Sequence, residues 1–341
     1  MKKDKGFISR VTGAVLVAAF LLLGNLTASA AEPGTLLNAS YDVAREFYKQ
    51  YNPLFEQHWK KKTGQSVTVT QAHGGSSTQA KAVADGLEAD VVTMNTSSDI
   101  DFLARAGVVS ADWAKEFPDN AAPTTSTMLF LVRKGNPKNI RDWNDLIRPD
   151  IKIVVVNPKT GGNGRYAYLA AWGQILHKGG SPEQAQEFIK KFYVNVPVLA
   201  SGGRAATTTF LQQNVGDVLI TFESEVVSVE RDFGQGKVEA VYPSVSIIAE
   251  NPVAIVKRTV DKKGSYDLAH EYLQYLYSEE AQEIAANNAL RPRSARVLAK
   301  HADFFKPIAL FSVQQYFGSL SEAQKTHFTD GAIFDQLYTK R

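Results

Sequence analysis

The pattern that decides the fold is plainest in Ile151-Lys152-Ile153-Val154-Val155-Val156-Asn157-Pro158-Lys159-Thr160-Gly161-Gly162-Asn163-Gly164. The apolar run at its start predicts a buried β-strand, and the glycine-rich run at its end predicts a turn. The residues that follow, to about His177, predict a helix. A strand, a glycine-rich turn and a helix in this order form the unit from which α/β proteins are built.

The same unit recurs on both sides of this stretch. Strands are predicted at 35–39, 66–71, 91–94, 128–132, 151–156, 196–200 and 218–222. Helices are predicted at about 43–61, 77–86, 164–177, 182–193 and 204–213, and from about Ser265 to the end of the chain. This alternation predicts the α/β class, with a largely parallel or mixed sheet.

The first thirty residues have the three parts of a secretory signal peptide. Basic residues at positions 2, 3, 5 and 10 precede an apolar run at 15–23, and Ala28-Ser29-Ala30 fits a cleavage site before Ala31. A membrane anchor is the alternative, but the apolar run is shorter than the roughly 18 residues that a membrane span needs. The chain has no cysteine, which rules out disulfides and a lipid on an N-terminal cysteine. We therefore expect a protein that is free in the periplasm.

Charge and histidine placement disfavour several classes of function. Residues 1–30 hold four of the 38 Lys and Arg residues and one of the 35 Asp and Glu residues, so the rest of the chain is formally neutral. Nucleic-acid binding is disfavoured, because it needs a clustered positive field. The six histidines are scattered and do not stand at metal-ligand spacing. Gly161–Gly164 fits neither nucleotide-binding motif, and we expect no cofactor.

The turns before the predicted helices form the candidate binding site. They are Ser40-Tyr41-Asp42, His73-Gly74-Gly75-Ser76, Gly161-Gly162-Asn163-Gly164 and Ser201-Gly202-Gly203. Helix N-termini present unpaired backbone N–H groups and about half a positive charge. In an open α/β sheet they gather at the carboxyl ends of the strands. The sequence thus predicts a site for an anion that is rich in donors and poor in acceptors.

Two interpretations of Ser76 stay open. Ser76-Ser77-Thr78-Gln79 fits a capping box, which predicts that Ser76 caps the following helix. The same hydroxyl would lie beside unpaired N–H groups, so a ligand contact is also possible. A hydrolase triad of Ser76, His73 and Asp42 is the weaker hypothesis, because the Gly-x-Ser-x-Gly elbow is missing.

Longer stretches of the chain resemble the prokaryotic sulfate- and thiosulfate-binding protein family. They are NASYD (38–42), HGGS (73–76), FLVRKGNPK (130–138), NPKT (157–160), YLAAWG (168–173), ATTTF (206–210) and GDVLI (216–220). The resemblance covers nearly all of the chain after the signal segment. It implies a two-lobed, type II periplasmic-binding-protein fold, with the ligand in the cleft between the lobes. On this basis we expect a signal peptide at 1–30, lobe 1 at 31–122, lobe 2 at 123–222, and a return to lobe 1 with C-terminal helices at 223–341.

The resemblance also implies which residues contact the ligand. The contacts would come from Asp42, Ser76, Gly161, Gly162, Asn163, Gly203 and Phe222. Asp42 would donate its backbone N–H while its carboxylate pairs with an arginine, and Arg165 and Arg204 are the candidates for this supporting charge. Sulfate-binding members carry serine at position 161 and tryptophan at 222, so two side-chain donors are missing here. Asn163 and Phe222 are more similar to the thiosulfate-binding branch.

The function expected from the resemblance is capture of sulfate or thiosulfate in the periplasm, without catalysis. The partners would be the anion and the permease of an ABC importer, and we expect a monomer that binds no nucleic acid. Two alternatives stay open: a periplasmic hydrolase on the same scaffold, and a binder of another tetrahedral oxyanion such as phosphate or molybdate. The preference between the two sulfur anions is open as well.

Overall fold

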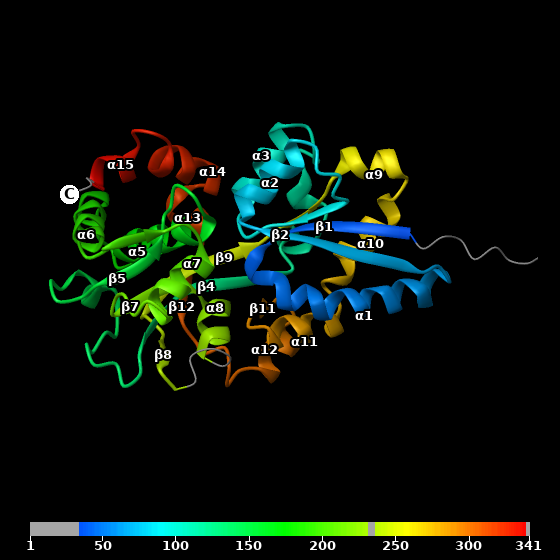
Figure 1. Cartoon of the computed structure of the whole chain (residues 1–341). Helices are drawn as coiled ribbons and strands as arrows, with labels where there is room; N and C mark the ends of the chain where they lie inside the picture. The colour runs from blue at the N-terminus through cyan, green and yellow to red at the C-terminus, as the bar shows by residue number, and fades with distance from the viewer. Residues whose placement is uncertain (1–33, 231–235, 339–341) are drawn as a thin grey trace, which may run out of the picture. The chain divides into compact units, whose positions relative to one another are not determined.

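The computed structural model describes residues 34–230 and 236–338 (Figure 1), so the predicted signal peptide lies outside the described residues. The strands are β1 (Gly34–Tyr41), β2 (Val67–Gly74), β3 (Val91–Thr93), β4 (Thr124–Arg133), β5 (Ile153–Val156), β6 (Val198–Ala200), β7 (Val218–Phe222), β8 (Val238–Val241), β9 (Val245–Asn251), β10 (Val253–Ile255), β11 (Arg291–Pro292) and β12 (Ala309–Phe311).

The α-helices are α1 (Arg45–Thr63), α2 (Ser76–Ala84), α3 (Ser97–Arg105), α4 (Pro118–Ala121), α5 (Gly162–His177), α6 (Pro182–Val194), α7 (Gly203–Leu211), α8 (Glu223–Ser228), α9 (Lys257–Lys263), α10 (Tyr266–Tyr275), α11 (Glu279–Asn287), α12 (Ala295–Lys300), α13 (Val313–Phe317), α14 (Leu320–Ala323) and α15 (Ile333–Leu337). Short 3-10 segments are η1 (Asp42–Ala44), η2 (Trp113–Lys115) and η3 (Trp143–Ile147), and η5 (Gln324–Phe328) is a π-helical turn.

The strands form two separate sheets, each with three parallel strands that end at one edge. The first sheet has the order β10-β3-β1-β2, and β1 pairs in parallel with both β2 and β3. The second sheet has the order β12-β9-β4-β7-β5-β6, and β5 pairs in parallel with both β6 and β7. The carboxyl ends of five of these six strands carry residues of the predicted site.

Each sheet has its own apolar core. In the first, the stripe of α1 that includes Tyr51 and Phe55 packs against Tyr272 of α10. In the second, Phe130 of β4 meets Trp143 of η3 edge-on. Such burial of large aromatic side chains is a major source of folding free energy. The chain returns to the first core at 253–290 and contributes to the second core again from Phe311 to Phe334.

One expectation about the last third of the chain is wrong, and three strands of this region were not predicted. The chain is not helical from Ser265 to its end, because β11 and β12 interrupt the helices. The sequence analysis also missed β8, β9 and β10. β12 has three residues and pairs with β9, and such a short strand depends on its neighbour rather than on a pattern of its own. The strand pairings place β8, β9 and β12 in the second sheet.

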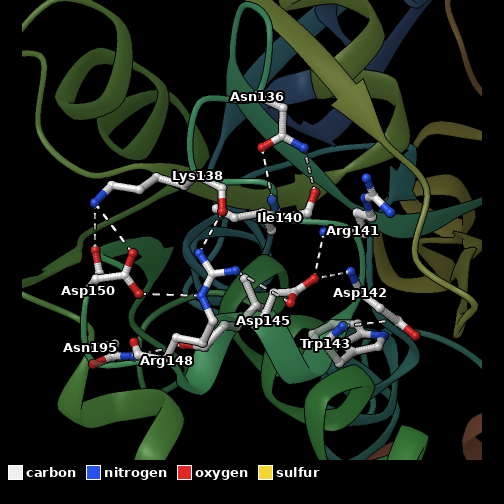
Figure 2. Close-up of polar contacts among 11 residues, drawn as sticks. Asn136, Lys138, Ile140, Arg141, Asp142, Trp143, Asp145, Arg148, Asp150 and Asn195 are labelled. Atoms are coloured by element: carbon white, nitrogen blue, oxygen red, sulfur yellow. Dashed lines mark hydrogen bonds and ion pairs between the residues drawn. The ribbon is translucent and has the colours of Figure 1, made fainter.

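Polar side chains fix the loop between β4 and β5 (Figure 2). Asn136 has a positive φ of 44°, and its amide both donates to the Ile140 carbonyl at 2.7 Å and accepts from the Ile140 N–H at 2.9 Å. Asp142 and Asp145 form a reciprocal capping box at the start of η3. The segment 133–138, which contributes to the family resemblance, therefore has a structural role in this loop.

Candidate functional site

The carboxyl ends of the parallel strands bring the predicted contacts together. Asp42 follows β1 and Ser76 begins α2 after β2, while Gly161 and Gly162 follow β5 at the start of α5. Gly203 begins α7 after β6, and Phe222 ends β7. The predicted residues thus occupy five of the six strand ends. The sixth, after β3, carries Asn95, which the sequence analysis did not single out.

Contacts join the carboxyl strand ends of the first sheet to those of the second. A Cβ atom on Gly162 would lie only 2.6 Å from Asn95 Oδ1 and 3.2 Å from Thr96 Cγ2. Arg165 Nη1 donates to Ser98 Oγ at 3.5 Å. Arg204 Nε lies 3.7 Å from Asp42 Oδ2. The carboxyl strand ends of the two sheets therefore face each other.

Three helices at these edges begin at a glycine that has no side chain to cap them. The N-cap residues are Gly75 for α2, Gly161 for α5 and Gly202 for α7, and none gives a side-chain hydrogen bond to the first turn. By contrast, Thr96 caps α3 and Ser181 caps α6 through their hydroxyls. An uncapped first turn leaves backbone N–H donors for another acceptor, such as an anion.

The prediction that Ser76 caps α2 is wrong, because Gly75 holds the N-cap position. Ser76 is buried in the first turn, where its Oγ accepts a hydrogen bond from the Asn95 N–H at 3.3 Å and lies 3.5 Å from Met94 Sδ. Neither described hydrogen bond involves His73, so the contacts of Ser76 do not favour the hydrolase triad.

The two candidate arginines have different partners. Arg204 is largely exposed and lies beside Asp42, which also accepts a hydrogen bond from Arg45 Nη2 at 2.9 Å. Arg165 is buried and donates to the Pro158 carbonyl at 3.2 Å. Burial raises the pKa of the nearby Asp99 carboxyl above its ordinary value, whereas the charge of Arg165 acts in the opposite direction. Arg165 thus supports the turn before α5 rather than Asp42.

A buried polar triad lies behind two of the uncapped helices. Asn163 Nδ2 donates to Thr221 Oγ1 at 2.8 Å and to Glu225 Oε2 at 3.1 Å, and Thr221 also donates to Glu225. A Cβ atom on Gly203 would lie 2.8 Å from one Glu225 oxygen and 2.9 Å from the other. Burial raises the pKa of Glu225 above its ordinary value. A buried carboxyl group therefore adjoins Gly203 and Asn163, and the sequence analysis did not predict this acceptor.

Positions 161 and 222, which lack side-chain donors, differ in the space available for a larger side chain. A Cβ atom on Gly161 would lie 3.3 Å from Val156 Cγ1, a tight but adjustable contact. Phe222 is buried, and its ring meets the Tyr166 ring edge-on, with 5.8 Å between the centroids. A larger ring at position 222 would need a shift of Tyr166 or of its neighbours.

A cavity of about 570 Å³ adjoins the site on the side of Asp42 and Glu225. Side chains from α1, α7 and α8 line it, and they include Arg45 and Arg204 as well as Asp42, Glu46 and Glu225. Charges of both signs line this cavity, in contrast to the glycine turns, whose polar groups are mainly backbone donors.

Metal binding and membrane insertion receive no support from the described part of the chain. Residues 34–230 and 236–338 contain no group of three or more His, Cys, Asp or Glu side chains placed to hold a metal ion. No helix among them has the length and apolar character needed to cross a membrane.

Asn95 and Glu225 are the polar residues of the site that the sequence analysis missed. The predicted strand at 91–94 ends in a polar run, Asn95-Thr96-Ser97-Ser98, which is a usable signal for a strand end at the site. Glu225 gives no such signal, because its partner Asn163 is brought to it by the pairing of β5 with β7, and only Thr221 is near it in the sequence.

Comparisons with known proteins agree with this geometry. The family model for bacterial extracellular solute-binding proteins matches residues 36–289. The thiosulfate-binding protein of Pseudomonas aeruginosa is 55% identical over 333 residues, which cover 97% of this chain and 99% of that protein. The sulfate-binding protein of Escherichia coli is 49% identical over 303 residues, which cover 89% and 92% of the two chains.

The solved structure of the sulfate-binding protein SubI from Mycobacterium tuberculosis superposes with a TM-score of 0.78 at 30% identity, covering 87% of this chain and all of that one. This match confirms the predicted solute-binding-protein fold. These relatives are binding proteins by name, in line with the expectation that the chain is not an enzyme. The chain belongs to the sulfate- and thiosulfate-binding protein family of bacterial extracellular solute-binding proteins.

Proposed function

We propose that the protein binds thiosulfate or sulfate between the two sets of strand ends and serves as the solute-binding component of an ABC importer. The observation that carries this proposal is the set of three uncapped helix N-termini, α2 on the first sheet and α5 and α7 on the second. Their backbone donors suit a small anion that brings several acceptor oxygens. The named specificities of the relatives support the choice of a sulfur oxyanion.

The proposed ligand contacts are the backbone N–H groups at Asp42, Gly162, Asn163 and Gly203, together with the Ser76 hydroxyl, whereas the Gly161 N–H already donates to the Asn157 carbonyl at 3.2 Å. Arg45 and Arg204 balance the Asp42 carboxylate, so this acid does not repel the ligand with a full charge. In this proposal, Gly203 places its N–H close to the anion because it has no Cβ atom to displace Glu225.

Thiosulfate is the preferred ligand in this proposal. Gly161 and Phe222 offer no side-chain donor, and the terminal sulfur of thiosulfate is larger and a weaker acceptor than oxygen. A phenyl ring at position 222 cannot donate a hydrogen bond to an anion oxygen. It can lie against the terminal sulfur, which is a weaker acceptor. The proposed location is the periplasm, after removal of residues 1–30. The proposed partner is the permease of the importer, and we propose that the protein binds it as a monomer.

Thermal unfolding of residues 31–341 with added anions tests the proposal. A ligand at about a thousand times its dissociation constant adds roughly 4 kcal/mol to the free energy of unfolding. We expect a clear rise in Tm with millimolar thiosulfate and sulfate, and little change with sodium chloride at equal ionic strength. A rise with phosphate alone would favour the alternative oxyanion, and no rise with either sulfur anion would refute the proposal.

A further inference from the structure

Asn95 lies where the two sets of proposed ligand contacts meet. It follows β3, which lies between β1 and β10 in the first sheet. Its backbone N–H donates to Ser76 Oγ at 3.3 Å. Its side-chain oxygen Oδ1 occupies the space next to Gly162, 2.6 Å from where a Cβ atom would be. One residue thus touches a proposed contact on each sheet.

The Asn95 side chain is buried and incompletely bonded. Only 8% of the residue is exposed, and Oδ1 has no hydrogen-bond partner among the described residues. An unpaired buried polar atom is costly, so its presence needs an explanation. A solely structural role would be filled at lower cost by an apolar side chain of similar size.

The amide group can present either end to its surroundings. An asparagine amide carries two N–H donors at one end and a carbonyl acceptor at the other. Rotation about χ2 exchanges the two ends, and this torsion has a broad, roughly two-fold preference. Since Oδ1 has no partner, turning it away from Gly162 breaks no hydrogen bond of that atom. The N–H group would then take the place of Oδ1 beside Gly162, at the start of α5.

We propose that Asn95 is a ligand-binding residue, whose side-chain amide donates a hydrogen bond to the bound sulfur oxyanion. The inference rests on the proposed function and adds a side-chain donor to it. Positions 161 and 222 carry no side-chain donor, so Ser76 and Asn95 together supply the side-chain hydrogen bonds of the site. Both come from the first sheet, whereas α5 and α7 of the second sheet supply backbone donors.

Asn95→Ala tests the contact, with Ser97→Ala as the matched control. Ser97 lies two residues further along, at the start of α3, and is only half-buried. Calorimetric titration with thiosulfate and with sulfate should show affinity lowered by about tenfold to a hundredfold in Asn95→Ala, the range for a hydrogen bond to a charged group. Ser97→Ala should bind like the wild type. An affinity for both anions within twofold of the wild type in Asn95→Ala would overturn the inference.

A second measurement follows ligand binding in the intact protein, and a variant serves only to assign its signals. In protein labelled with ¹⁵N-asparagine, the Asn95 side-chain amide signals, assigned by their loss in Asn95→Ser, should move on addition of thiosulfate. The side-chain signals of Asn136, which is held in the distant β4–β5 loop by Ile140 (Figure 2), should stay in place. If the wild type binds neither anion, the proposed function fails. If it binds but the Asn95 signals do not move, only the present inference fails.

Discussion

Three glycines, Gly75, Gly161 and Gly202, determine what the site offers to a ligand. In six described helices, α3, α6, α11, α12, α13 and α14, a hydroxyl side chain such as that of Thr96 or Ser181 satisfies one of the first N–H groups. Where glycine takes the N-cap position, those donors depend on another acceptor. Glycine at this position costs only a few tenths of a kcal/mol relative to a good cap. Donors for an anion are thus obtained with little loss of stability.

Ser76→Ala should affect binding more than folding. The hydroxyl does not cap α2, so the ligand-free protein loses the acceptor of the Asn95 N–H and the contacts of the hydroxyl with Met94 Sδ and the Asp99 carboxyl, at about 1 kcal/mol. Loss of a hydrogen bond to the anion should weaken binding by about 1.5–3 kcal/mol. Urea unfolding without ligand, together with calorimetric titration, separates the two effects. Unchanged affinity with reduced stability would remove Ser76 from the site.

Selectivity should respond to Gly161→Ser combined with Phe222→Trp. The two changes restore donors directed at oxygen, each contributing about 1.5–3 kcal/mol if well placed, and they reduce the space for a terminal sulfur. Gly161→Ser needs only a small shift of Val156, whereas the indole must displace Tyr166, which costs about 1–3 kcal/mol. The ratio of sulfate affinity to thiosulfate affinity, measured by titration, should therefore rise. A ratio that stays constant or moves toward thiosulfate would show that these positions do not set selectivity.

The sequence predicted the backbone part of the site better than its side-chain part. Glycine-rich turns after apolar strands are local signals, so Gly161, Gly162 and Gly203 were identified as candidates. Asn95 and Glu225 depend on contacts with residues more than fifty positions away, and no local pattern reports such contacts. The capping-box pattern at Ser76 was misleading, because Gly75 takes the cap one residue earlier.

Among the elements, α5 links the site to the C-terminal part of the chain. Its first turn carries Gly162 and Asn163, and further along the helix Tyr168 and Trp172 pack against His327 of η5. His327 is buried, and its Nδ1 lies 3.0 Å from the Tyr168 hydroxyl. The sequence predicted α5, which is long and follows an apolar strand. It did not predict β12 and η5, which are short and form by packing on the second sheet.

The buried His327 should make stability fall in mild acid. Burial lowers the pKa of His327 to about 4 from an ordinary value of 6.5. Between pH 6.5 and pH 4 the His327 ring is protonated in the unfolded chain but stays neutral in the folded chain. The free energy of unfolding therefore decreases as the pH falls toward 4. The full effect is about 3 kcal/mol.

Urea unfolding at pH 7 and at pH 4.5, for the wild type and for His327→Asn, checks this. His327→Asn should lose less stability than the wild type between the two pH values. His177 is exposed and provides the control, because His177→Asn should lose as much stability as the wild type. Equal losses in the wild type and His327→Asn would show that His327 does not govern this pH range.

For the whole molecule, the proposed function makes binding a property of the strand ends of both sheets together. Neither edge alone completes the site, since α2 and Asn95 belong to the first sheet and α5 and α7 to the second. The chain after the predicted signal segment is formally neutral, so the account attributes anion binding to local dipoles and hydrogen bonds rather than to net charge. The α/β class was predictable from the alternation of strands and helices, and the two-lobed fold from the family resemblance, whereas the return of β8, β9 and β12 to the second sheet was not.

The most direct test of this account is a crystal structure of residues 31–341 with thiosulfate, with the sulfur atoms located by their anomalous signal. The account predicts one anion between the two edges, within hydrogen-bond distance of the Ser76 hydroxyl and the backbone N–H groups at Gly162, Asn163 and Gly203. An anion bound instead in the cavity beside Arg45, or no anion at saturating thiosulfate, would contradict it.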